Sequence, residues 1–216
     1  MARPLTTAPG FGPRAVVVIV SLPALEHRVD AFLISTGVVA LAEIGDKTQL
    51  LALLLAARFR KPTAIILGIL VATLANHALA GALGAWLTSL VGPRTMQWVL
   101  AVSFITMGIW TLIPDKYEET KAPASRLGIF VTTVVAFFLL EIGDKTQIAT
   151  VALAAKYSSL SAVVAGTTIG MMLANAPAVL LGDVVVRKVP MKIVRGTAAA
   201  IFVVLGLMML ARVSLT

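Results

Sequence analysis

The chain has 216 residues, of which 59% are hydrophobic and 13% are charged, so it has too little polar surface for a soluble domain of this length. Apolar runs of about 20 residues, long enough to cross the hydrocarbon core of a bilayer, recur along it. The net charge of +8 does not indicate nucleic-acid binding, because the basic residues stand in short segments between these runs. With no cysteine and two histidines, thiolate sites are excluded and imidazole-based metal sites are disfavoured.

Residues 1–30 are interpreted as an N-terminal extension or a signal segment. They have a basic start and a short apolar run, residues 15–25, which is too short to span a membrane and contains Pro23. No clear small-x-small cleavage site follows this run, so both interpretations stay open.

Six apolar segments follow, and we predict that each is a transmembrane helix. They form two sets of three, residues 31–114 and 127–216, on either side of a polar, cytoplasmic linker at residues 115–126. The predicted fold class is an all-α integral membrane protein, with spans at residues 31–57, 63–90, 95–113, 127–156, 159–186 and 191–212.

The second set repeats the first. At an offset of 98 the same residue type recurs in several places, including Phe32 and Phe130, Gly68 and Gly166, Gly84 and Gly182, and Gly108 and Gly206. Because each set has an odd number of spans, the second must enter the membrane from the opposite side. The sequence therefore predicts two inverted three-helix repeats, an arrangement typical of secondary transporters with a site at the repeat interface.

Basic residues between the spans predict the orientation. The connections after the fourth and second spans hold only Lys156 and Arg94. Because cytoplasmic loops carry an excess of Lys and Arg, the other connections are predicted to be cytoplasmic and both termini external. The basic residues of those connections are Arg58, Arg60, Lys61, Lys116, Lys121, Arg126, Arg187, Lys188, Lys192 and Arg195.

One seven-residue string, Glu-Ile-Gly-Asp-Lys-Thr-Gln, occurs twice inside apolar segments, where ionisable residues are functional candidates. On a continuous helix, Glu43 and Asp46 lie about 60° apart, with Gln49 on the same arc and Lys47 about 40° to the other side of Glu43. If the two copies face each other, four carboxylates and two amide oxygens converge, and hard divalent cations take such ligands. The predicted metal ligands are Glu43, Asp46, Gln49, Glu141, Asp144 and Gln147.

The charges of the two copies predict competition between metal and protons. Four carboxylates and two lysines, Lys47 and Lys145, leave a net charge of −2, which one divalent cation or two protons neutralise. This predicts roughly two protons per divalent ion, provided that both lysines point toward the site. In an alternative, Glu43–Lys47 and its counterpart are i,i+4 pairs that neutralise each other for packing.

Further residues of the motif have two interpretations each. Gly45 and Gly143 either permit close helix approach or let the helix break and lend carbonyl groups to the ion. Thr48 and Thr146 either bond back to their own helix or touch the ion.

Polar residues in the second and fifth spans are also candidates. Asn76 and Asn175 occur at matching places and serve either as interhelical hydrogen bonds or as groups near the ion. His77 has no counterpart in the second repeat and is interpreted as a packed or hydrogen-bonded histidine rather than a metal ligand. The predicted supporting residues are Lys47, Thr48, Lys145, Thr146, Asn76 and Asn175.

At these residues the chain resembles the calcium/manganese cation–proton antiporter family of the LysE transporter superfamily, whose members carry Glu-x-Gly-Asp-(Lys/Arg)-(Thr/Ser) twice. The resemblance covers roughly residues 30–213, and both copies match without departure. It implies export of Mn²⁺, with Ca²⁺ as a second substrate, in exchange for protons, with the acidic motif residues binding the cation and no prosthetic group. The compact length is similar to that of bacterial plasma-membrane members.

Two other functions compete with a secondary antiporter. A passive divalent-cation channel could use the same acidic residues, although an inverted repeat favours alternating access. An intramembrane metalloenzyme is disfavoured, because its metal usually keeps an open position beside another catalytic group. The expected partners are the divalent cation and the lipid bilayer, without nucleic acid, and the sequence does not indicate an oligomer.

Overall fold

The computed structural model describes residues 22–113, 128–181 and 191–214, and these residues are helical apart from short connections. The predicted linker at residues 115–126 and residues 1–21 lie outside the described residues. In chain order the helices are α1 (Leu22–Glu43), α2 (Lys47–Phe59), α3 (Pro62–Leu90), α4 (Pro93–Leu112), α5 (Ile129–Glu141), α6 (Lys145–Lys156), α7 (Leu160–Leu181) and α9 (Met191–Ser214).

Four of these helices, α3, α4, α7 and α9, are long and apolar enough to cross a membrane. The other two predicted spans, residues 31–57 and 127–156, are each divided at the repeated motif into α1 and α2 and into α5 and α6. α1 begins at Leu22, nine residues before the predicted start at residue 31. The exposed residues 25–30, which are mostly polar, extend this helix rather than lying outside it.

Local sequence explains where α2 ends and where α3 and α4 begin. Proline occupies the first turn of α3 and of α4, where its missing N–H costs no helical hydrogen bond. Arg60 ends α2 in the left-handed conformation, with φ of 53°, and its N–H donates to the carbonyl of Ala56. Only Lys61 then separates this residue from Pro62, so α2 and α3 are joined by a tight turn.

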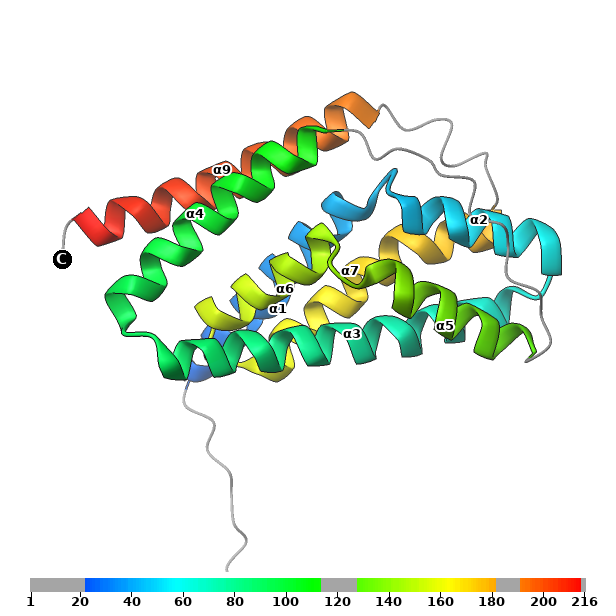
Figure 1. The fold of residues 1–216 in the computed structure, drawn as a ribbon, viewed down its shortest axis with the longest axis horizontal. Helices are drawn as coiled ribbons and strands as arrows, with labels where there is room; N and C mark the ends of the chain where they lie inside the picture. Colours follow the sequence, from blue (N-terminus) through cyan, green and yellow to red (C-terminus); the bar gives the residue numbers. More distant parts are fainter. Residues whose placement is uncertain (1–21, 114–127, 182–190, 215–216) are drawn as a thin grey trace, which may run out of the picture.

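The two repeats contact each other reciprocally (Figure 1). A Cβ atom on Gly68 of α3 would lie 3.0 Å from the carbonyl oxygen of Phe130 in α5. A Cβ atom on Gly166 of α7 would lie 2.5 Å from the carbonyl oxygen of Phe32 in α1. Each residue of the first pair is 98 positions from its counterpart in the second. An approximate two-fold axis between the repeats would produce this reciprocity.

α4 and α9 lie side by side along one edge of the molecule in Figure 1 and make a close pair. A Cβ atom on Gly108 would lie 2.7 Å from a methyl group of Val203, and one on Gly206 would lie 2.6 Å from Ile105. Both distances are too short for a side chain, so these two glycines, again 98 residues apart, allow the two helices to touch.

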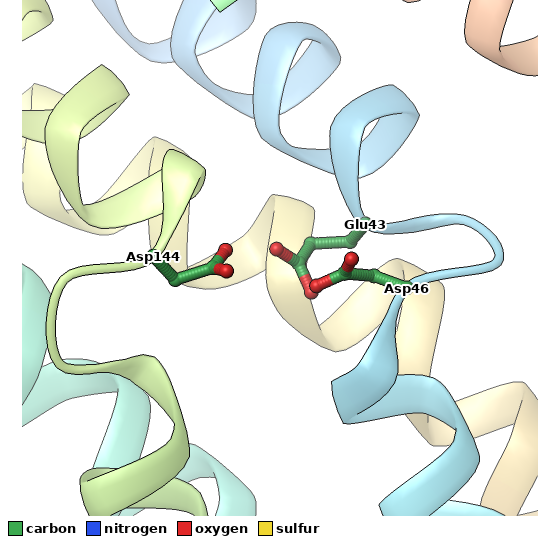
Figure 2. A group of neighbouring side chains, drawn as sticks. All are labelled: Glu43, Asp46 and Asp144. Carbon is green, nitrogen blue, oxygen red and sulfur yellow. The ribbon is translucent and has the colours of Figure 1, made fainter. Parts of the chain in front are cut away.

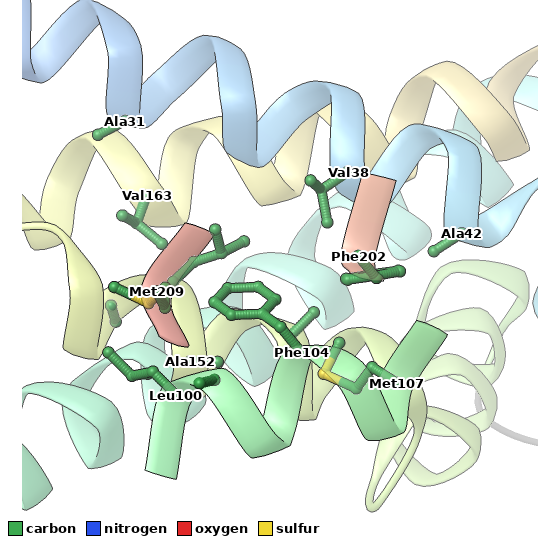
Figure 3. Close-up of a cluster of buried hydrophobic side chains, with 14 of the residues drawn as sticks. Ala31, Val38, Ala42, Leu100, Phe104, Met107, Ala152, Val163, Phe202 and Met209 are labelled. Carbon is green, nitrogen blue, oxygen red and sulfur yellow. The ribbon is translucent and has the colours of Figure 1, made fainter. Parts of the chain in front are cut away.

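Buried apolar side chains form two clusters on either side of the repeated motif. The first cluster joins α1, α4, α6, α7 and α9 around Phe104 and Phe202, whose ring centroids are 6.3 Å apart (Figure 3). The second cluster joins α2, α3, α5 and α7 around Phe137 and Leu55. Among the described residues, α4 and α9 contribute only to the first cluster, so the packing of the two repeats is not fully symmetric.

Candidate cation site

Both copies of the motif interrupt a helix at the same residues. α1 ends at Glu43 and α5 at Glu141, and the glycine two residues later takes a positive φ, 79° at Gly45 and 76° at Gly143. The prediction of one continuous helical arc through each motif was therefore wrong. Of the two interpretations of the glycines, the structure shows the helix break, because a residue with a side chain would be strained at this φ.

Each break is closed by the same set of hydrogen bonds. The N–H of Asp46 donates to the carbonyl of Glu43 at 3.0 Å, and the equivalent Asp144–Glu141 bond is 3.1 Å. Asp46 and Asp144 then serve as the N-cap residues of α2 and α6. Each aspartate carboxylate is thus placed at the positive end of a half-helix, where a negative charge is stabilised.

The glutamine of each motif holds the break in shape. The side-chain oxygen of Gln49 accepts a hydrogen bond from the N–H of Gly45 at 2.9 Å, and that of Gln147 accepts from Gly143 at 2.8 Å. The predicted role of these two amide oxygens as metal ligands stays a prediction. In this structure one lone pair of each is directed to a glycine N–H.

Gly143→Ala is expected to destabilise the protein by about 1–2 kcal/mol, because an L side chain at φ of 76° is strained even where space is free. Gly143→Asn should cost less, since asparagine tolerates this conformation. Thermal unfolding of the purified protein in detergent measures the effect. Gly37→Ala is the matched control, because Gly37 lies inside α1 with open space around it and alanine should stabilise that helix. Equal stability of the Gly143→Ala and wild-type proteins would contradict the strain.

Three carboxylates from both repeats converge at the breaks. Glu43, Asp46 and Asp144 are buried, and each offers an oxygen within 4.8 Å of the others. In Figure 2, Glu43 at the end of α1 and Asp46 at the start of α2 lie together, and Asp144 points toward them from the junction of α5 and α6. The fourth predicted carboxylate, Glu141, is fully buried at its own break but does not belong to this group of three.

The two lysines pair across the repeats. Lys47 Nζ lies 2.7 Å from Asp144 Oδ1, and Lys145 Nζ is bonded to Asp46 Oδ1. The alternative in which each lysine only neutralises the glutamate four residues before it is therefore wrong, because the break turns the lysine toward the other repeat. The condition of the charge argument, that both lysines face the carboxylates, is met.

The motif threonines donate hydrogen bonds to the glutamates. Thr48 Oγ1 donates to Glu43 Oε2 at 2.6 Å, and Thr146 Oγ1 donates to Glu141 Oε2 at 3.1 Å. The expectation that these hydroxyl groups bond back to their own helices was wrong. The second oxygen of each glutamate, Oε1, is buried and accepts no hydrogen bond from the described residues, so it is available to a proton or a cation.

The two asparagines occupy matching places but make different bonds. Asn76 Nδ2 donates to the carbonyl of Phe138 in α5 at 3.0 Å, which is the interhelical role expected of it. Asn175 Nδ2 donates within α7 to the carbonyl of Met171 at 3.1 Å. The neighbouring carbonyl, that of Ala174, accepts from Gln49 Nε2 at 2.8 Å. Sequence reasoning missed these backbone acceptors, because no residue type marks a carbonyl.

His77 is fully buried in α3, as its interpretation as a packed histidine requires. Neither ring nitrogen has a hydrogen-bond partner among the described residues, and His77 does not belong to the group of carboxylates.

Comparison of the sequence with known protein families shows the family to which this chain belongs. The sequence profile described as "Divalent cation/proton antiporter GDT1" matches residues 31–119 and 129–215. The chain belongs to this family of divalent cation/proton antiporters. The resemblance noted from the motif is confirmed, and this GDT1 family is a family of transporters rather than enzymes.

Several curated proteins are similar to this GDT1 family member. A protein of Vibrio cholerae serotype O1 named "Putative manganese exporter" is 52% identical over 183 residues, 84% of this chain and 91% of that protein. GDT1-like protein 4 of Oryza sativa subsp. indica is 28% identical, covering 80% of this chain and 68% of its own length. GDT1-like protein 5 of Arabidopsis thaliana is 26% identical, covering 80% and 92%. No solved structure matches the chain.

The geometry of the three carboxylates suits a hard cation of the kind a GDT1 antiporter carries. Oxygen ligands that lie opposite each other around Mg²⁺ or Ca²⁺ are roughly 4–5 Å apart, given metal–oxygen distances of about 2.0–2.6 Å. The spread of 4.8 Å in Glu43, Asp46 and Asp144 therefore needs little closing to bind one ion. Counted together, the four carboxylates and two lysines of the two motifs have a formal charge of −2 when all are ionised.

Proposed function

We propose that the protein exchanges Mn²⁺, with Ca²⁺ as a second substrate, for protons, and that Glu43, Asp46, Glu141 and Asp144 bind the cation. The observation that carries this proposal is the cross-pairing of Lys47 and Lys145 with the aspartates of the opposite repeats. The two ion pairs join the acidic and basic groups of both motifs, and the four carboxylates and two lysines of these motifs have a formal charge of −2 when all are ionised. Bound metal and two bound protons then become alternative neutral states of the site.

The preference for Mn²⁺ rests on the Vibrio cholerae relative, whose name states manganese export. In the proposed role Gln49, Gln147, Asn76 and Asn175 orient the site or complete the ligand set with their amide oxygens, and Thr48 and Thr146 position the glutamates. A cation with six oxygen ligands fits three or four carboxylates and a few such neutral oxygens.

We also propose that the six predicted spans form two inverted repeats in a bacterial plasma membrane, with both termini external. In this arrangement α1 with α2 and α5 with α6 are two discontinuous spans whose breaks meet near the bilayer midplane. Such broken helices are the usual ion sites of secondary transporters. The basic residues Arg58, Arg60 and Lys61 at the α2–α3 turn support a cytoplasmic position for that end of the molecule. Exchange driven by protons entering the cell would then export Mn²⁺.

Reconstituted liposomes test the function. The purified protein is reconstituted with a pH dye inside, and Mn²⁺ is added outside while the membrane voltage is clamped. We expect the lumen to become more alkaline as Mn²⁺ enters, with roughly two protons leaving for each ion and therefore no net current. Liposomes without protein are the control for leakage.

A passive divalent-cation channel is the alternative that the same acidic groups would permit. Under the voltage clamp a channel lets Mn²⁺ enter without any change in luminal pH and carries a current. That result would overturn the exchange mechanism and with it the two-proton argument.

A further inference from the structure

One end of the molecule contains a cavity that the proposed site does not use. This end, which we call the N-face, is where α1 begins and where the connections between α3 and α4 and between α6 and α7 lie. The cavity measures about 520 Å³, and its lining includes the polar side chains of His27, Thr88, Gln97 and Ser158.

A second, apolar cavity continues from the first toward the motif. It measures about 220 Å³ and shares Val91, Met96, Leu100 and Ala155 with the first cavity. Its lining reaches Ile148 of α6, which directly follows Gln147 of the second motif. The two cavities together therefore extend from the polar N-face along α4 and α6 to Ile148, one residue after the second motif.

The first hydrophobic cluster closes this route. Met96 and Leu100 of α4 line both cavities and belong to the cluster, as does Met209 of α9 at the outer cavity. An apolar constriction of this kind excludes water and hydrated ions until its walls separate. Separation requires the α4–α9 pair to leave α1 and α6.

The opposite side of the molecule has an apolar face that the α4–α9 pair does not cover. Val38 and Ala42 of α1 are buried in the first cluster, but their counterparts 98 residues later, Ala136 and Leu140 of α5, are half-buried. Ala152 of α6 is also buried there, whereas its counterpart Leu54 of α2 is half-buried. The second repeat thus has an equivalent apolar surface, formed by Ala136, Leu140 and Leu54, against which α4 and α9 could pack.

We infer that the two cavities are the N-face path of the transported cation, and that the α4–α9 pair is its gate, which opens by moving from α1 and α6 to Ala136, Leu140 and Leu54. The tight crossing at Gly108 and Gly206 makes the two helices move as one pair. This inference rests on the proposed transport function. It assigns Met96 and Leu100 as gate residues and gives the asymmetry between the repeats a role in the transport cycle.

Cross-linking tests the gate without background labelling, because the chain has no cysteine. Met96→Cys with Ala155→Cys joins α4 to α6 beside both cavities. A short, reducible bifunctional thiol reagent is applied to the protein in liposomes, and mass spectrometry measures the fraction cross-linked. We expect Mn²⁺/proton exchange to fall at least about tenfold in proportion to cross-linking and to return on reduction. Exchange at the unmodified rate by fully cross-linked protein would overturn the gate.

The matched control joins α4 to α9 through Ile105→Cys with Val203→Cys, which flank the glycine crossing. Because these helices are inferred to move together, cross-linking should leave exchange unchanged, and a loss equal to that of the first pair would overturn the inference. Exchange by each variant before cross-linking shows that it is folded. If no preparation exchanges Mn²⁺ for protons, the proposed function fails, whereas exchange insensitive to the Met96–Ala155 cross-link contradicts the gate alone.

Thiol labelling provides a second, independent test. In the protein cross-linked between α4 and α6, a water-soluble maleimide should react faster with Leu140→Cys than with Ala42→Cys, its counterpart in the other repeat. Leu140 is half-buried on the face that the α4–α9 pair does not cover, and Ala42 is buried in the first cluster. Equal labelling rates would mean that the two repeat faces are equally covered, which would also overturn the inference.

Discussion

Replacing Glu43 with glutamine is expected to abolish Mn²⁺/proton exchange while leaving the folded protein at least as stable as the wild type. Glutamine keeps the volume of the side chain, and its carbonyl oxygen can still accept the hydrogen bond from Thr48. The variant loses one negative charge from a buried site. Removing one charged partner of the bound cation costs about 3–5 kcal/mol of binding free energy, so cation affinity should fall by roughly two to four orders of magnitude. In the protein without bound cation, the missing charge reduces repulsion among the remaining carboxylates, so the variant should not be less stable than the wild type.

Two measurements on the same preparation separate this role from a structural one. Exchange in liposomes should be lost, and thermal unfolding in detergent with a chelator should occur at the same or a higher temperature than in the wild type. Glu141→Gln is the repeat-related variant and should behave in the same way, because Glu141 holds the equivalent place beside Thr146. If exchange and stability both decreased in the Glu43→Gln variant, Glu43 would be a structural residue. If the variant exchanged at the wild-type rate, Glu43 would not belong to the cation site.

Replacing Lys145 with methionine is expected to destabilise the empty protein by about 3–5 kcal/mol, because it leaves the buried carboxylate of Asp46 without its lysine. The net charge of the site becomes −3 instead of −2. Added Mn²⁺ should therefore raise the unfolding temperature of this variant by more than it raises that of the wild type. A cation can replace the lost positive charge beside Asp46.

Lys47→Met is the matched comparison for this experiment. Lys47 pairs with Asp144 in the equivalent position, but its side chain is 32% exposed, whereas that of Lys145 is 8% exposed. Water screens the more exposed pair, so the loss of stability should be clearly smaller for Lys47→Met. Thermal unfolding with a chelator and then with Mn²⁺ measures both variants. Equal losses, or no difference in stabilisation by Mn²⁺, would contradict the electrostatic role assigned to the two lysines.

Much of the fold could be predicted because the chain repeats itself. The apolar segments predicted helices, and the offset of 98 residues paired Gly68 with Gly166 and Gly108 with Gly206, which the structure places where helices touch. α1 begins nine residues before the predicted span at residue 31, because the mostly polar residues 25–30 continue the helix. The asymmetric packing of α4 and α9 could not be predicted, since the residues that recur in both halves do not indicate which of the two equivalent positions the pair occupies.

The membership of the site was easier to predict than its geometry. The motif placed carboxylates, lysines, threonines and glutamines together, but a helical wheel assumes a continuous helix. Once Gly45 and Gly143 take a positive φ, each lysine points toward the other repeat and each threonine toward a glutamate. Glycine has no side chain that would distinguish close packing from a left-handed turn, so both interpretations stood until the backbone was known.

The exchange of ion pairs between the repeats has a consequence for how the molecule is assembled. In the folded protein each aspartate forms an ion pair with the lysine of the other motif, Asp46 with Lys145 and Asp144 with Lys47. A half inserted alone would place one ammonium group and one carboxylate in the membrane without these partners. Each half therefore depends on the other for these ion pairs, and the group of carboxylates is completed only when the two halves meet.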